Sequence, residues 1–144
     1  MNELDIAWAA GFFDGEGSAL VEKTNTGYTI VVNVANNNKE AIDFFHKNWG
    51  GRIVCITKEK WAEYGRKANQ DAYQLKFNHN DAARLLLDLY PYLIAKKLHA
   101  RIVMSALASI PEQRQGKRIP RGFTQLLKPF YEEMEEKGFI HSSK

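Results

Sequence analysis

Apolar positions in the first part of the chain change from helical to strand-like spacing. Residues 2–14 are apolar on nearly all sides, which predicts a buried helix with Asn2 as its N-cap. Two runs rich in β-branched residues follow at 18–23 and 28–35, and the TNTG between them is typical of a turn. The pattern therefore predicts a β-hairpin directly after the first helix.

A second helix and a second hairpin are predicted next. Asn37, with Glu40 three residues later, predicts a capping box at the start of a helix that ends at Gly50-Gly51. Runs at 52–58 and 72–77 predict two more strands, joined by a long basic tip at 58–71.

The rest of the chain favours helices. HNDAARLLLDLY predicts a helix that ends before Pro91, and residues 93–110 predict a long helix that ends at Pro111. A polar, basic linker follows, and FTQLLKPFYEEMEEKG predicts a terminal helix that is kinked or interrupted at Pro129.

This order predicts an α+β fold with an antiparallel four-stranded sheet and helices on one face. Ile30, Val32 and Val34 would share the covered face, whereas Gln74 and Lys76 would lie on a mixed, hydrogen-bonding face left open. We expect residues 1–110 to form the core domain, and residues 111–144 to supply a basic linker and a C-terminal helix that packs on it.

Composition limits the classes of protein that fit. The 144 residues are 44% hydrophobic and 26% charged, which is ordinary for one globular domain. No apolar run is long enough for a membrane span and no secretory signal is evident, so we expect an intracellular protein that is not secreted. The single cysteine, Cys55, excludes an internal disulfide and suits a reducing compartment.

The net charge of +3 is unevenly distributed. Residues 1–129 carry 18 basic and 13 acidic side chains, a net charge of +5, because four glutamates gather near the C-terminus. This balance is compatible with a polyanionic partner without requiring one.

The stretch AAGFFDGEG, residues 9–17, places two glycines where a helix is predicted. Each costs about 1 kcal/mol relative to alanine, but glycines four residues apart let another backbone approach one helix face. We expect this face to be a helix–helix contact formed by Ala7, Ala10, Gly11 and Gly15. If the partner is the same helix of a second subunit, two Glu16 carboxylates meet at a two-fold axis, where a divalent cation such as Mg²⁺ would join them.

AAGFFDGEG resembles the LAGLIDADG motif of homing endonucleases and intron maturases. VNVANNNKEAIDFFHKNWGG and LYPYLIAKKLHARIV are similar to two further blocks of that family, in the same order, so the resemblance covers about residues 4–110. It implies an αββαββα fold, motif helices at the centre of a dimer, and open sheet faces in the DNA major groove. The single motif resembles the homodimeric members, which cut long, pseudo-palindromic sites.

The resemblance also implies roles for individual residues. Glu16 matches the metal-binding acid, with the Gly15 carbonyl beside it, and Asp14 matches an acid that structures the helix end. Lys96 matches the active-site lysine, which would stabilise developing charge or position the attacking water. Asn36 matches a polar position that orients solvent near the metals, although simple helix capping explains it equally well.

Polar residues predicted on the open sheet face are candidate DNA contacts, or else ordinary solvated side chains. They are Glu22, Thr24, Tyr28, Thr29, Asn33, Arg52, Lys58, Gln74 and Lys76. Basic residues outside the strands would contact phosphates or serve only solubility: Lys60, Arg66 and Lys67 on the hairpin tip, and Lys117, Arg118 and Arg121 in the linker. A strand of about eight residues spans roughly 26 Å, or about 8 base pairs, so two subunits would read on the order of 16.

The resulting hypothesis is a homodimeric, site-specific, double-strand DNA endonuclease that uses Mg²⁺ or Mn²⁺. Its setting would be the cytoplasm or nucleoid of a microbe, or an organelle matrix. Three alternatives share the same features: an RNA maturase that assists intron splicing, a DNA-binding regulator without cleavage, and a scaffold in which the glycine helix is only a dimer contact.

Overall fold

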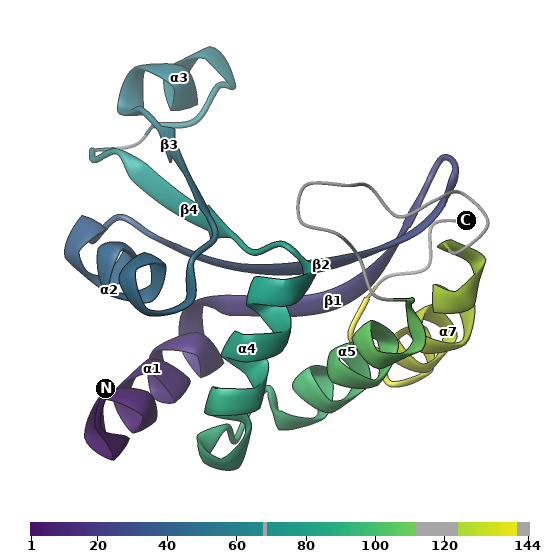
Figure 1. The fold of residues 1–144 in the computed structure, drawn as a ribbon. Coiled ribbons are helices and arrows are strands. Elements are labelled where there is room, and N and C mark those ends of the chain that lie inside the picture. The colour runs from purple at the N-terminus through teal and green to yellow at the C-terminus, as the bar shows by residue number, and fades with distance from the viewer. Residues whose placement is uncertain (68, 112–123, 141–144) are drawn as a thin grey trace.

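Four antiparallel strands form one sheet, and helices cover one of its faces (Figure 1). The computed structural model describes residues 1–67, 69–111 and 124–140. Its first half comprises α1 (Glu3–Glu16), β1 (Gly17–Thr24), β2 (Gly27–Asn36), α2 (Lys39–Trp49), β3 (Arg52–Ile56), α3 (Lys58–Glu63) and β4 (Ala72–Lys76). Its second half comprises α4 (His79–Leu89), the 3₁₀ turn η1 (Tyr90–Tyr92), α5 (Lys97–Ser109), the 3₁₀ turn η2 (Gln125–Leu127) and α7 (Lys128–Glu136).

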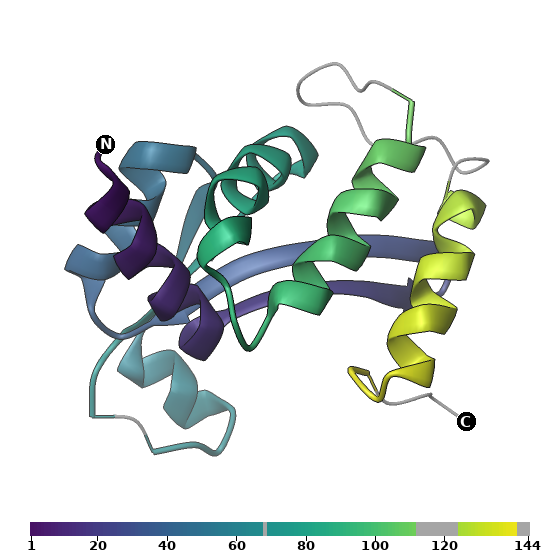
Figure 2. The ribbon, with the colours of Figure 1, turned by 90° about the horizontal axis from the view of Figure 1, so that it is seen from below.

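The strand order in the sheet is β1-β2-β4-β3. Seen from below, α1, α4, α5 and α7 lie across the strands as one layer (Figure 2). All four of these helices therefore lie on the same face of the sheet, and none of them lies on the opposite face (Figure 1). This arrangement confirms the predicted α+β fold, and the two hairpins lie where the β-branched runs predict them.

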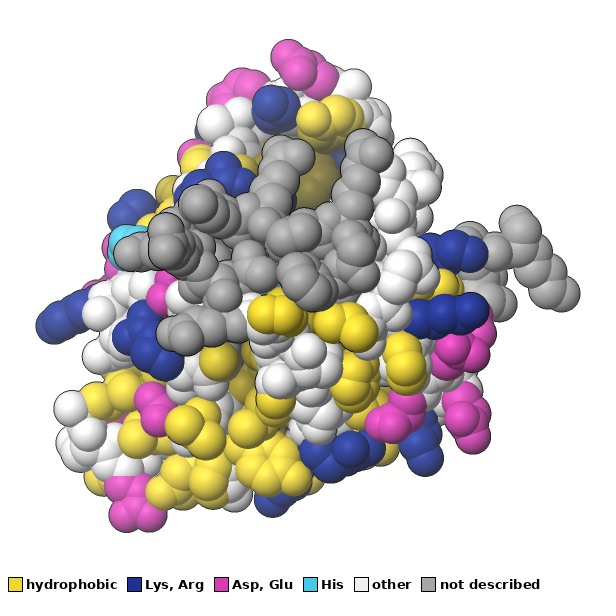
Figure 3. Space-filling view, turned by 45° about the vertical axis from the view of Figure 1, so that its right-hand side comes forward, with side chains coloured by type: hydrophobic (Ala, Val, Ile, Leu, Met, Phe, Trp, Pro, Cys, Tyr) yellow, Lys and Arg dark blue, Asp and Glu magenta, His cyan; other side chains and the backbone are white. Residues whose placement is uncertain are grey.

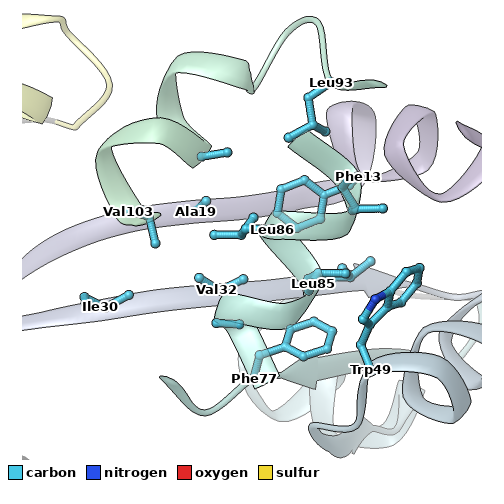
Figure 4. Packing of buried hydrophobic residues seen from close by; sticks show 14 of the residues in the cluster. Phe13, Ala19, Ile30, Val32, Trp49, Phe77, Leu85, Leu86, Leu93 and Val103 are labelled. Atoms are coloured by element: carbon cyan, nitrogen blue, oxygen red, sulfur yellow. The ribbon is translucent and has the colours of Figure 1, made fainter. Parts of the chain in front are cut away.

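The core fills the space between the helix layer and the sheet (Figure 4). Phe13 of α1 and Leu85 and Leu86 of α4 are fully buried, and they lie over Val32 of β2. Trp49 closes one end of this core, and its indole N–H donates to an Asp88 carboxylate oxygen at 2.9 Å. The alternation of apolar and polar residues along the strands therefore separates a covered face from an open one.

Asparagines cap three of the helices. The side chains of Asn2, Asn38 and Asn78 each accept a hydrogen bond from the backbone N–H three residues later, at the starts of α1, α2 and α4. Asn2 confirms the predicted cap. The predicted cap Asn37 is wrong by one residue, because Asn38 caps α2.

Two other local predictions are wrong. The predicted helix over 93–110 begins only at Lys97, after an irregular segment. The strand predicted over 52–58 ends at Ile56, and the hairpin tip contains the short helix α3, which is capped by Thr57. The predicted interruption at Pro129 is confirmed: the 3₁₀ turn η2 ends at Leu127 and α7 begins at Lys128, with Pro129 in its first turn, where proline needs no hydrogen-bond partner.

The α7 helix packs on α5 and on the edge strand β1 (Figure 2). The Tyr131 and Tyr28 ring centroids lie 5.2 Å apart, and the Arg101 guanidinium contacts the Glu133 carboxylate at 2.8 Å. The basic linker, with Lys117, Arg118 and Arg121, lies outside the described residues. Within the part of the chain that is described, no helix is both long and apolar enough to cross a bilayer.

Candidate active site and nucleic-acid interface

Glu16 is the last residue of α1, and the chain enters β1 without an intervening loop. This junction needs a glycine at position 17, because a Cβ there would overlap the Phe13 ring. Glu16 and Gly15 are exposed, and among the described residues the Glu16 carboxylate has no hydrogen-bond or ion-pair partner.

The electrostatics at this end of α1 favour a cation. The last turn contains Asp14 and Glu16 and no basic residue, although the negative end of a helix dipole normally attracts basic side chains. Carboxylates and backbone carbonyls are the oxygen ligands that Mg²⁺ and Mn²⁺ prefer. The donor set therefore fits a divalent cation, but the described residues of one chain contain no group of three Asp, Glu, His or Cys side chains able to hold one.

Asp14 joins α1 to the segment that leads into α5. Its carboxylate accepts backbone N–H bonds from Ile94 and Lys96, both at 2.9 Å. The Lys96 ammonium donates in turn to the Asp14 backbone carbonyl at 2.7 Å. The Lys96 ammonium is thereby bound to the backbone of residue 14, two positions before Glu16, and Asp14 holds the end of α1 against the segment before α5.

Replacing Asp14 with alanine is expected to lower the free energy of unfolding by about 1.5–3 kcal/mol, because two backbone N–H groups lose a charged acceptor. Urea unfolding followed by circular dichroism measures this loss. Asp14→Asn keeps one acceptor oxygen and should lose less. Equal stability of the alanine variant and the wild type would contradict the role of Asp14 as an anchor.

His99 lies one helical turn after Lys96 and stacks on Phe139 of the C-terminal segment, with ring centroids 3.6 Å apart. Its Nδ1 is buried and has no hydrogen-bond partner among the described residues. Burial lowers the pKa of the His99 imidazole below 6.5, and the positive charge of Lys96 lowers it further. Burial also lowers the pKa of His79.

Because these pKa values are lowered, the unfolded chain binds more protons than the native chain near and below pH 6.5. Stability should therefore fall as the pH falls from about 7.5 to about 5. His99→Phe retains an aromatic stacking partner for Phe139 but removes one titrating group, so its urea-unfolding free energy should depend less steeply on pH. An unchanged slope would show that His99 does not contribute.

Asn36 ends β2 and begins the turn into α2. Its side-chain oxygen accepts the Asn38 backbone N–H at 2.8 Å, which is the capping chemistry that its sequence context predicts. Its role in orienting solvent near a metal stays a prediction.

The small-residue face of α1 differs in part from the prediction. Ala10 is fully buried in the core of its own chain, so its assignment to a contact surface is wrong. Gly11 and Gly15 are exposed, and a Cβ at either would meet nothing within 4 Å, so packing within the described chain requires neither glycine. Ala7 is half-buried.

Leu4 and Trp8 extend this exposed face, and sequence reasoning missed them. Leu4 is 80% exposed and Trp8 is 48% exposed. Leu4, Trp8, Gly11 and Gly15 follow the spacing of one helix face. Sequence reasoning could not single out this face, because the helix is apolar on nearly all sides. Hydrophobic side chains also gather at the bottom of the molecule, over the helix layer (Figure 3).

The strand register decides which side chains share the open sheet face. Ser18 pairs with Asn33, Asn33 with Lys76, and Lys76 with Arg52, so these four form a row across all strands. Seven predicted contacts lie on this face: Glu22, Thr24, Thr29, Asn33, Arg52, Gln74 and Lys76. Ser18, Leu20, Val31 and Val54 share it, and the prediction omitted them.

Two predicted contacts lie elsewhere. Tyr28 is on the helix-covered face, because it alternates with the open-face residue Thr29 and its ring packs on Tyr131. Lys58 is not on the sheet, because β3 ends at Ile56 and Lys58 begins α3. Its backbone N–H donates to the Asp71 carboxylate at 2.8 Å.

No protein-family model matches the sequence. A comparison with curated proteins gives no match either. The fold, however, is that of solved homing endonucleases. The homing endonuclease I-CvuI, bound to the I-CreI target with 2 mM Mg and the DNA not cleaved, superposes with a TM-score of 0.57 at 18% identity, covering 89% of this chain and 95% of I-CvuI.

Two further structures agree. I-CvuI bound to its own target with 2 mM Ca gives a TM-score of 0.52 at 18% identity and covers 88% of this chain and 94% of that one. The group I intron-encoded homing endonuclease I-CeuI, complexed with DNA, gives 0.53 at 17% identity and covers 74% of this chain and 55% of I-CeuI. At these identities the likeness establishes the fold, and activity has to be argued from the site.

Proposed function

We propose that this chain is a homodimeric, site-specific DNA endonuclease that requires Mg²⁺ or Mn²⁺. The observation that carries the proposal is the junction of α1 with the segment before α5. There the ammonium of Lys96 is bound to the Asp14 carbonyl, two residues before Glu16, whose carboxylate has no partner among the described residues. An acid with free ligand positions beside a fixed lysine is suited to phosphodiester hydrolysis.

A second copy of the chain would complete the site. One described chain offers too few ligands for a metal, whereas a two-fold axis beside α1 would bring two Glu16 carboxylates together. The exposed stripe of Leu4, Trp8, Gly11 and Gly15 supports this axis, because its glycines would let two helix backbones approach closely.

In this proposal Glu16 and the Gly15 carbonyl would hold the cation. A bound divalent cation supplies a water of lowered pKa and Lewis-acid polarisation of the scissile phosphate. The Lys96 ammonium, oriented by the Asp14 carbonyl, would donate to a phosphate oxygen and stabilise its developing negative charge. Asn36 would orient solvent beside it.

The open sheet face would read the DNA. The row of Ser18, Asn33, Lys76 and Arg52 starts two residues after Glu16, so it would meet bases near the cut. Glu22 of β1 and its cross-strand partner Thr29 of β2 lie four residues further along the strands, roughly 13 Å away, and would meet bases about four pairs further out. Arginine at position 52 favours guanine and glutamine at position 74 favours adenine in the major groove.

The proposal is tested by incubating the protein with a library of randomised DNA duplexes in Mg²⁺ and sequencing the cut ends. Parallel samples contain Ca²⁺ in place of Mg²⁺. Recovery of cut sites in Mg²⁺ alone is the expected result. Enrichment by binding without cleavage would indicate a DNA-binding regulator, and neither cutting nor enrichment would redirect the search to intron RNA.

A further inference from the structure

The helical insertion between β3 and β4 is a basic element that the proposed sheet–DNA contact does not use. Residues 58–67 contain four basic and two acidic side chains, a net charge of +2. Three of the basic residues, Lys58, Arg66 and Lys67, line a hollow of about 450 Å³, together with Ala62, Gly65 and Asn69. Neither acid of the segment lines it, so the hollow presents only positive charge.

Two hydrogen bonds hold the start of α3 in this insertion. Thr57 accepts the Lys60 backbone N–H at 3.2 Å and caps α3. The Lys58 backbone N–H bonds to Asp71 at the base of β4, which ties the helix to the end of the hairpin.

Its C-terminal turn positions a guanidinium. Gly65 adopts a φ of +76°, which favours glycine, and the chain folds back so that the Arg66 backbone N–H donates to the Trp61 carbonyl at 3.0 Å. The Arg66 guanidinium lies 5.5 Å from the Trp61 ring centroid, and the Tyr64 ring packs edge-on against Trp61. The turn and the ring contact thereby orient the exposed Arg66 side chain.

The topology places α3 at the same end of the sheet as Glu16. β1 begins after Glu16 and β2 ends at Asn36, which pairs with Tyr73 at the α3 end of β4. The β1–β2 turn lies at the opposite end. In Figure 1 both α1 and α3 lie in the left half and this turn lies at the right, with α3 above the sheet and α1, α4 and α5 below it.

We infer that α3 and the turn after it bind the phosphate backbone of double-stranded DNA next to the cleavage position, beside the duplex that the sheet reads. This inference rests on the proposed function. Three cations around a hollow, and none of the acids, match a polyanion. Its location at the end of the sheet where α1 joins β1 assigns the contacts to the central phosphates of the target and not to its outer ends.

The test uses full-length Arg66→Ala/Lys67→Ala protein and measures binding to a recovered target duplex in Ca²⁺ over a range of KCl concentrations. The slope of log affinity against log salt should become shallower by about 0.9 for each phosphate that the variant no longer neutralises. Lys128→Ala/Lys137→Ala removes the same charge from the helix layer and should leave the slope near that of the wild type. Phosphate-ethylation interference should disappear next to the cut in the Arg66/Lys67 variant only.

A second pair of variants separates charge from positioning. Trp61→Phe keeps a ring under Arg66 and should bind nearly as the wild type does, whereas Trp61→Ala frees the guanidinium and should weaken binding. Equal salt slopes for the two double variants would overturn the inference, and so would ethylation interference that disappears only at the outer ends of the target. Neither result would affect the proposed function if the wild type still cleaves DNA. Failure of the wild type to bind or cut any duplex would overturn the proposed function, and this inference with it.

Discussion

Replacing Glu16 with glutamine is expected to abolish metal-dependent DNA cleavage and to leave the fold unchanged. Glutamine has nearly the same shape, and Glu16 is exposed and has no partner among the described residues, so the chain loses no internal contact. The change removes one negative oxygen ligand from each subunit. Since metal-ion catalysis supplies several kcal/mol, the cleavage rate should fall about 10³-fold or more.

The measurement is single-turnover cleavage of a recovered target duplex in Mg²⁺, combined with binding of the same duplex in Ca²⁺. Glu132→Gln, an exposed acid on α7, is the matched control and should cut at the wild-type rate. Binding should remain within a few-fold in both variants. Cleavage by the Glu16 variant within about tenfold of the wild-type rate would exclude Glu16 as the metal-binding acid.

Replacing Gly11 with leucine is expected to separate the dimer without unfolding the subunit. Within one described chain a Cβ at this position meets only open space, and removing a helical glycine should stabilise α1 by up to about 1 kcal/mol. At a close helix–helix contact the same side chain would keep the backbones apart, at a cost of about 1–3 kcal/mol for each copy. The dimer dissociation constant should therefore rise at least about tenfold, and cleavage should fall with it.

Sedimentation equilibrium over a range of concentrations measures the dissociation constant, and circular dichroism checks the helix content. Gly17→Ala is the contrasting variant, because its Cβ would overlap the Phe13 ring and should destabilise the subunit itself. If the Gly11 variant and the wild type have the same dimer dissociation constant, the dimer contact lies elsewhere.

The elements that local chemistry determines could be predicted from the sequence. Alternating β-branched residues and a turn signal are enough to define the hairpins, and the asparagine before the first apolar run is enough to define the cap of α1. The predictions failed where a residue distant in the sequence determines the local structure. The helix predicted from residue 93 starts at Lys97, because Asp14, some 80 positions earlier, takes the N–H groups of Ile94 and Lys96.

The candidate site was predictable only in part for the same reason. Small residues predict a contact face on α1, but no local signal separates the buried Ala10 from the exposed Gly11 next to it. The hydrogen bond from Lys96 to the end of α1 spans 82 residues and was not predicted; only the choice of Lys96 as a candidate active-site lysine came from the family resemblance. Side chains alternate between the two faces of β2, so once the register is known Thr29 lies on the open face and Tyr28 lies on the covered face against Tyr131.

The symmetry of the DNA sites that the wild-type protein cuts in Mg²⁺ tests the central claim most directly. Two copies of one chain related by a two-fold axis should read inverted half-sites, so the aligned cut sites from the randomised library should form a pseudo-palindrome centred on the cleavage position. Its length should be on the order of 16 base pairs or more. Cut sites without a two-fold relation, or cuts at no preferred sequence, would contradict a homodimeric, site-specific endonuclease.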